Sequence, residues 1–222
     1  MTIPSAKAMS TAIASIFSDL HSNNLIQDYD GPIRPMCGRL NKIPDGQKWA
    51  LEVSSGMPIR FKETTDKNGD PIIPEIIADL EVDPSKETFP YLKWQIALEI
   101  KRPDQSPVAR WHFDLAEPGQ SAPKIHMQCG GHFANGTERD KEIPLKTPRW
   151  HHHAVDLLLL TEIVISSFYH DEWQQARLLP KWCPSINKSQ HLCLLPYVNQ
   201  IKDKIEVSGT TVMSQLWNGT WT

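Results

Sequence analysis

The feature that most constrains the fold is a central stretch, residues 48–129, in which apolar and polar side chains alternate in short runs separated by turn sequences. The side chains of a strand point alternately to its two faces, so a period of two indicates strands. The expected strands are 49–53, 59–61, 72–80, 94–100, 108–115 and 124–129. Turn signals between them, such as Asn68-Gly69, favour tight hairpin connections. We therefore predict a meander of antiparallel strands.

Helical patterns flank this stretch on both sides. Residues 5–27 carry apolar side chains at helical spacing, which predicts an amphipathic N-terminal helix. The following residues, 28–47, are rich in Gly and Pro and are expected to form no regular element. Thr147-Pro148 has the chemistry of a helix start and predicts one long buried helix that ends near Tyr169. Shorter helical segments are expected after it.

Together these elements predict an α+β fold: an N-terminal helix, an antiparallel β-meander and a C-terminal helical layer with one long buried helix. No repeat or composition shift marks a linker, so residues 1–222 are expected to form a single domain. The last ten residues, 213–222, place two tryptophans in a largely polar context and are expected to be a flexible or partner-binding tail.

The order of helix, meander and helix resembles that of ubiquitin-conjugating-enzyme-like domains. The resemblance is one of topology, because the His-Pro-Asn string of that family and the cysteine near it are missing from this chain. It therefore implies no role for any residue here.

Composition limits the classes of function. The formal net charge of −3 gives no basic field that would draw the chain to nucleic acid. The longest apolar run, 154–160, contains Asp156 and is far shorter than the ~20 residues of a membrane span. The N-terminus lacks the pattern of a signal peptide. Four cysteines without a paired spacing favour reduced thiols and a cytoplasmic protein.

Two strands, 108–115 and 124–129, are expected to pair as a hairpin with one polar face. Alternation places Trp111 and Phe113 toward the core, and it places Arg110, His112 and Asp114 on the opposite face, where His126 of the partner strand joins them. A carboxylate that orients a histidine suits general acid–base chemistry, with Arg110 holding an anionic substrate. The alternative is a solvated sheet face stabilised by cross-strand charges.

Two further groups of side chains are candidates for binding. His126, Cys129 and His132 have ligand types that suit zinc, although no paired CxxC motif accompanies them, and no other cofactor is indicated. Three successive histidines, 151–153, are expected in the first turn of the long helix, where they point in different directions and cannot all bind one ion.

Eight tryptophans are many for a chain of this length, and tryptophan is enriched at interface hot spots. Four of them lie outside the strongly periodic segments: Trp173, Trp182, Trp217 and Trp221. They support a first hypothesis, an intracellular binding protein that is a subunit of a larger complex. The second hypothesis is a hydrolase or phosphodiesterase-type enzyme that uses the hairpin cluster. The sequence leaves the oligomeric state open.

Overall fold

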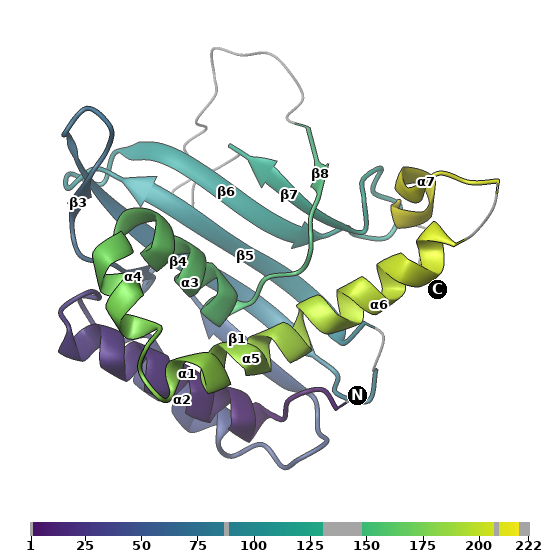
Figure 1. Ribbon diagram of the computed structural model, residues 1–222, viewed down its shortest axis with the longest axis horizontal. Helices are drawn as coiled ribbons and strands as arrows, with labels where there is room; N and C mark the ends of the chain where they lie inside the picture. Colours follow the sequence, from purple (N-terminus) through teal and green to yellow (C-terminus); the bar gives the residue numbers. More distant parts are fainter. Residues whose placement is uncertain (1, 87–88, 131–147, 207–208, 218–222) are drawn as a thin grey trace.

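A single antiparallel sheet forms the centre of the computed structural model shown in Figure 1, which describes residues 2–86, 89–130, 148–206 and 209–217. Its main path runs β1-β4-β5-β6-β7-β8, and β2 and β3 pair with β4 beside this path. The strands are β1 Trp49–Val53, β2 Ile59–Arg60, β3 Thr64–Thr65, β4 Pro71–Val82, β5 Tyr91–Lys101, β6 Pro107–Leu115, β7 Ile125–Cys129 and β8 Trp150–His151. Both the meander and the α+β class are confirmed.

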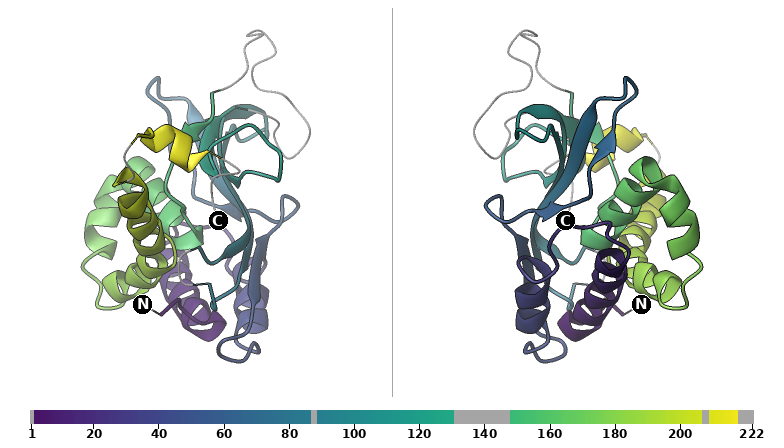
Figure 2. Two further views of the ribbon diagram at one scale, coloured as in Figure 1. Left: turned by 90° about the vertical axis from the view of Figure 1, so that its right-hand side faces the viewer. Right: turned by 90° about the vertical axis from the view of Figure 1, so that its left-hand side faces the viewer.

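Seven helices accompany the sheet among the described residues. They are α1 Ala6–Ser22, α2 Ile33–Leu40, α3 Leu157–Phe168, α4 His170–Ala176, α5 Trp182–Leu192, α6 Leu194–Ile205 and α7 Val212–Leu216. Figure 2 shows α1 and α3 to α6 as a layer on one side of the sheet. The apolar side chains of that sheet face and of the helices form the core.

α1 begins where the sequence places it, because Ser5 caps it and its side chain accepts a hydrogen bond from the backbone N–H of Ala8. The expectation that residues 28–47 contain no regular element is wrong, since α2 lies within them. Its apolar residues Ile33, Met36, Cys37 and Leu40 recur at helical spacing and are buried. Pro35 is tolerated because it lies in the first turn, where backbone N–H groups have no partner within the helix.

The buried apolar run lies in a helix, as expected, but α3 begins at Leu157 and not near Pro148. Asp156 caps it: one carboxylate oxygen accepts from the backbone N–H groups of Leu158 and Leu159 at 3.1 and 3.0 Å. The other oxygen accepts from the Ser189 hydroxyl at 2.6 Å. Residues 150–151 form strand β8, so the three histidines 151–153 are not in a helical turn. The expected cap, Thr147, lies outside the described residues.

Candidate functional site

The hairpin of β6 and β7 has the predicted register. Asp114 faces His126, and Phe113 faces Met127, so the polar and apolar sets fall on opposite faces of the sheet. The polar set lies on the side away from the helical layer, which we call the outer face. His126 faces His151 of β8 in turn. Two side chains of this face are buried rather than solvated, because His126 is only 1% exposed and His112 only 9%.

His112 is held between two charged neighbours. Arg110 Nη1 lies 2.7 Å from His112 Nδ1, and His112 Nε2 lies 2.7 Å from Asp114 Oδ2. A guanidinium can only donate, so Nδ1 accepts and the ring carries its proton on Nε2, which donates to the carboxylate. The hydrogen bonds therefore fix both the orientation and the tautomer of His112.

His126 has the opposite tautomer. Its Nδ1 lies 3.1 Å from the backbone carbonyl oxygen of Pro123, which can only accept, so Nδ1 carries the proton. Its Nε2 therefore has a free lone pair, and no described residue donates a hydrogen bond to it. Burial lowers the pKa of His126 below its usual value of 6.5, although the nearby Asp114 carboxylate acts in the opposite direction. The ring is a neutral base held in place.

A network of charges extends from the hairpin across the outer face. Glu99 of β5 accepts from Arg110 Nε at 3.2 Å and contacts Lys101 Nζ at 3.1 Å. Lys101 also contacts Glu75 of β4 at 2.7 Å, and Glu75 pairs with Arg60 of β2 at 2.6 Å. The side chains of Glu75 and Glu99 are both 1% exposed. Burial lowers the pKa of Lys101, but its hydrogen bonds to the two carboxylates outweigh this, and the pKa is raised.

Sequence reasoning missed the members of this network on β2, β4 and β5. A signal was present, because Glu99 and Lys101 alternate with the apolar residues Leu98 and Ile100 along β5 as the hairpin residues do along β6. Their burial could not be read from that alternation, since a polar face of an antiparallel sheet is ordinarily solvated.

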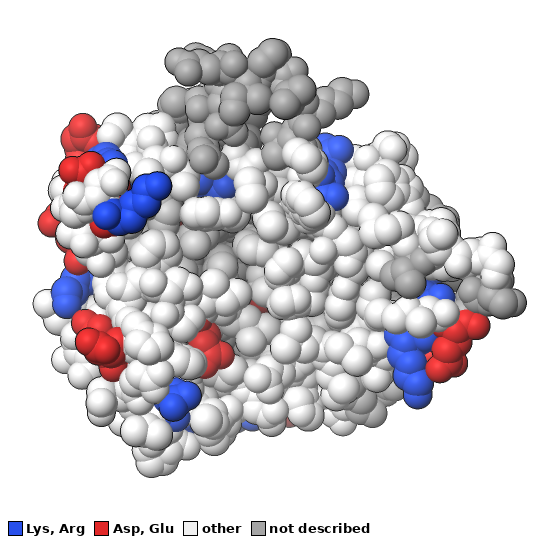
Figure 3. All heavy atoms as spheres, turned by 45° about the horizontal axis from the view of Figure 1, so that its top comes forward, with Lys and Arg blue, Asp and Glu red and all other residues white. Residues whose placement is uncertain are grey.

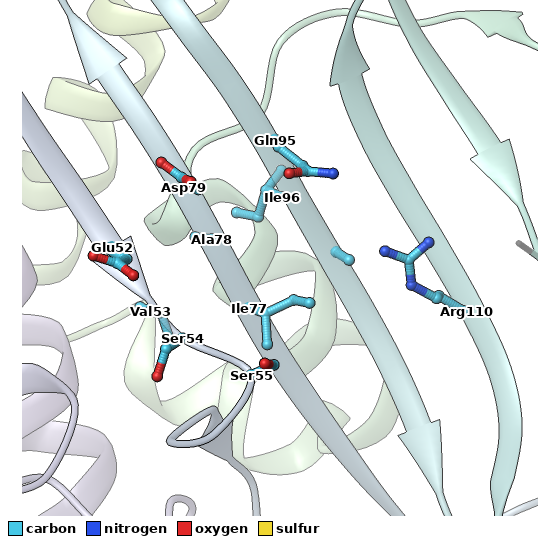
Figure 4. A pocket seen from close by; sticks show the side chains of 11 residues that line it. Glu52, Val53, Ser54, Ser55, Ile77, Ala78, Asp79, Gln95, Ile96 and Arg110 are labelled. Atoms are coloured by element: carbon cyan, nitrogen blue, oxygen red, sulfur yellow. The ribbon is translucent and has the colours of Figure 1, made fainter. Parts of the chain in front are cut away.

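Beside the hairpin, the outer face is hollowed over β1, β4, β5 and β6 (Figure 4). The hollow has a volume of about 290 Å³. Ile77 and Ala97 line it, Arg110 borders it on the β6 side, and Glu52 and Asp79 border it on the β1 and β4 side. A second hollow lies farther along β5 and β6 and includes Asp114, Gln95 and Lys124 in its lining. The hairpin cluster therefore adjoins concave surface on both sides.

The zinc candidates are not brought together. His126 and Cys129 are three residues apart on β7, so they point to opposite faces, and Cys129 Sγ contacts Met127 Sδ at 3.7 Å. His132 lies outside the described residues. Among the residues that the structure describes, no three His, Cys, Asp or Glu side chains are grouped so that they could hold a metal ion.

The successive histidines 151–153 pack against α6 and the core and do not form a metal site. Tyr197 Oη lies 2.9 Å from His151 Nδ1, and the ring of His152 packs against Phe113 at 5.1 Å between centroids. Burial lowers the pKa of both His151 and His153 to about 4, with His152 nearby adding to the effect. His151 and His153 are therefore packing groups that stay neutral near pH 7.

The four candidate tryptophans divide into different environments. Trp182 is 1% exposed and belongs to the core, so it is not available to a partner. Its indole N–H and that of Trp173 both point to Glu162 Oε1, at 3.1 and 3.4 Å. Trp217 is 38% exposed, and Trp221 lies outside the described residues.

An apolar stripe that the sequence analysis missed runs along α6 and is exposed in part. Leu194, Val198, Ile201 and Ile205 follow one another at spacings of four, three and four residues, which places them on one side of the helix. Val198 is 55% exposed and Ile205 58% exposed, and Pro196 is the one buried residue of this helix. Met213 of α7 is 48% exposed as well. The spacing of these apolar residues was visible in the sequence, but helices that pack inside a core show the same spacing.

Charged side chains are sparse over much of the face drawn in Figure 3, and they gather toward its two ends. No helix in the described parts of the chain is long and apolar enough to cross a membrane.

Comparison with protein-family models, with curated proteins and with solved structures found no match. Function is therefore argued from the geometry alone.

Proposed function

We propose that this chain is an intracellular binding protein, a subunit of a larger complex, that docks a helix of another protein against the apolar stripe of α6. The observation that carries the proposal is the exposure of Val198 and Ile205 at heptad-like spacing on a helix with a single buried residue. Exposed apolar side chains that are contiguous are typical of interaction sites. An apolar stripe at this spacing is the pattern that binds a partner helix.

The position of α6 supports the same proposal. Figure 1 shows α6 extending from the end of α5 toward α7 along the margin of the helical layer. Tyr197 attaches its first half to His151, while Ile205 near its other end stays exposed. Met213 and Trp217 are also exposed and extend the apolar surface beyond the helix. A partner helix that covered this surface would bury side chains that water now contacts.

The test compares two neighbouring positions of α6. Val198→Glu places a charge on the stripe, and Asn199→Glu places the same charge on an exposed position beside it. We expect the partner cross-linked to the wild-type protein in its native cells to be lost with Val198→Glu and retained with Asn199→Glu. Circular dichroism should show both variants folded, because both side chains face solvent.

Two outcomes would contradict the proposal. Equal partner recovery by the two variants would show that the stripe is not the binding surface. A wild-type protein that sediments as a homodimer and becomes monomeric with Val198→Glu would replace the proposed partner with a second copy of this chain.

The hairpin cluster supports a second candidate function, acid–base hydrolysis of an ester or phosphodiester. The observation in its favour is the neutral ring of His126, which is oriented by the Pro123 carbonyl and has an unprotonated Nε2 near Asp114. Such a base activates water, and Arg110 would neutralise an anionic substrate. The pKa of His126 is lowered, so more than half of the rings are in the base form at pH 6.5, and the midpoint of the rise in activity should lie below that pH.

Hydrolysis of p-nitrophenyl acetate and bis(p-nitrophenyl) phosphate tests this function. Removing a general base costs roughly 10²-fold or more in rate, so His126→Gln should lose activity to that extent. His191→Gln, at an exposed histidine on α5, is the control and should keep it. Wild-type protein that hydrolyses neither compound faster than the His126→Gln variant would count against the enzyme.

A further inference from the structure

We propose that Lys124 is a nucleophilic amine that forms an imine with a small aldehyde or ketone held in the second hollow, the one beside Asp114. This chemistry requires neither the partner helix nor the hydrolysis proposed above. The hollow has a volume of about 380 Å³, within the range of roughly 300–1,000 Å³ that small-molecule sites have. Its lining comes from β5, from β6 and from the loop that precedes β7.

Lys124 differs from the other cations of the outer face because it has no anionic partner. Each of the others contacts a carboxylate: Arg60, Lys93, Lys101 and Arg110. No ion pair or side-chain hydrogen bond joins Lys124 to any residue in the described parts of the chain, although its side chain is partly buried. Burial without a counter-ion disfavours the charged form of an amine.

The environment of the hollow favours the neutral form of this amine. Burial lowers the pKa of Lys124 below its usual value of 10.5, and no neighbouring charge adds to the shift. By contrast, the hydrogen bond to Asp79 raises the pKa of Lys93, which lines the same hollow. At a pH below both values, Lys124 therefore has the larger share of neutral amine, the form that attacks a carbonyl group. The charged side chains that share this lining with Lys124 are Lys93 of β5, Asp114 of β6 and Glu117 of the loop.

The backbone fixes the start of the Lys124 side chain. The Lys124 N–H donates to the carbonyl of Leu216 at 2.8 Å, and the Lys124 carbonyl accepts from the N–H of Ala116 at 2.9 Å. Gln95 lies in the same lining and has an amide that can donate to the oxygen of a bound carbonyl compound. An amine held next to a hydrogen-bond donor in a hollow has the arrangement that attack on a carbonyl group needs.

Imine formation at Lys124 balances without a further reactant. The lone pair of Nζ attacks the carbonyl carbon and forms a C–N bond, while the π electrons of the C=O bond move to the oxygen. Both hydrogens of the amine are transferred to that oxygen, which leaves as water, and a C=N bond remains. One amine and one carbonyl compound therefore give one imine and one water, with no oxidation or reduction.

Reductive labelling with propionaldehyde and sodium cyanoborohydride tests the proposal. The hydride converts the imine to a stable secondary amine, and mass spectrometry of the peptides measures the rate at each lysine. We expect Lys124 to react about fivefold or more faster than Lys93, which lines the same hollow. The rate at Lys124 should also saturate as the propionaldehyde concentration rises, because the hollow binds the aldehyde before the amine attacks it. Equal rates at the two lysines, or a rate at Lys124 that stays linear in propionaldehyde, would overturn the proposal.

Matched variants identify the amine. Lys124→Arg keeps the positive charge but cannot be deprotonated, so the rapid labelling should be lost while circular dichroism shows the fold retained. Lys7→Arg, at an exposed lysine of α1, is the control and should keep the rapid labelling. Rapid labelling that persists in the Lys124→Arg variant would assign the reactive amine to another lysine and overturn the proposal.

Discussion

At the scale of single residues, the buried charges of the outer face depend on Lys101. Its ammonium lies 2.7 Å from Glu75 and 3.1 Å from Glu99, and each of these two side chains is only 1% exposed. A buried carboxylate that loses its cation keeps its desolvation cost without the compensating attraction. Lys93, on the same strand, pairs with Asp79 in an exposed position, where the carboxylate has no comparable desolvation cost.

Lys101→Met should lower the free energy of unfolding by about 2 kcal/mol, less than the roughly 3–5 kcal/mol found when a buried ion loses its only partner, because Glu75 retains Arg60 and Glu99 retains Arg110. Lys93→Met, the control on β5, should lower it by less than about 1 kcal/mol. Urea denaturation of both variants measures the difference. Equal stabilities would mean that the Lys101 contacts contribute no more than a surface pair.

The lowered pKa values of two partly buried histidines, His151 and His153, predict that the chain loses stability in mild acid. The pKa values of His151 and His153 are about 4 in the folded chain and about 6.5 in the unfolded chain. Between these values the unfolded state binds more protons, so stability is complete above pH 6.5 and falls as the pH is lowered toward 4. Both rings are partly exposed, so solvent screening reduces the total loss to roughly 1–2 kcal/mol.

Unfolding by urea at pH 7.5, 5.5 and 4.5 measures this dependence. The double variant His151→Gln with His153→Gln should show a smaller decrease in stability between pH 7.5 and 4.5 than the wild type. His191→Gln serves as the control and should retain the full decrease. A wild-type stability that stays constant over this interval would show that the two rings remain accessible to protons in the folded chain.

At the scale of elements, the alternation of β1, β4, β5, β6 and β7 was sufficient to predict the strands and the faces of the hairpin. Period-two patterning carries that information locally. The start of α3 was not predictable in this way, because Pro148 and Asp156 both have the chemistry of a helix start. What selects Asp156 is Ser189, 33 residues later, which donates to the second carboxylate oxygen. α2 was missed because its Gly and Pro content hid four apolar residues at helical spacing.

The same long-range contact predicts the cost of changing the cap. Asp156→Ala removes the acceptor of two backbone N–H groups and of the Ser189 hydroxyl in a fully buried position, and should lower stability by about 3 kcal/mol. Burial raises the pKa of Asp156, so the neutral isostere in Asp156→Asn should be tolerated better than alanine. Thermal unfolding shows which of the two variants is more stable, and an alanine variant more stable than the asparagine variant would contradict this prediction.

At the scale of the whole molecule, the described part of the C-terminal segment up to Trp217 contacts the loop that precedes β7. Leu216 is 2% exposed, and its carbonyl accepts from the backbone N–H of Lys124 at 2.8 Å. Trp217 forms a bridge with Pro123. The polar composition of residues 213–222 gave no sign of this contact, because one buried leucine and one backbone hydrogen bond are enough to dock a short helix.

Truncation after residue 211 should therefore lower the free energy of unfolding by about 2 kcal/mol, the value of one buried leucine together with one backbone hydrogen bond. Truncation after Trp217 keeps both interactions and should leave stability unchanged, which makes it the matched control. Denaturation of the two shortened chains checks this. Equal stabilities would show that the docked helix contributes nothing to the fold.

The segment Pro123–Lys124 makes two backbone hydrogen bonds to different parts of the molecule. The Lys124 N–H donates to the carbonyl of Leu216 in α7, and the carbonyl of Pro123 accepts a hydrogen bond from His126 Nδ1 and so orients that imidazole. Two adjacent residues therefore join α7 to the polar side of the hairpin, although the helix and the hairpin lie far apart along the chain.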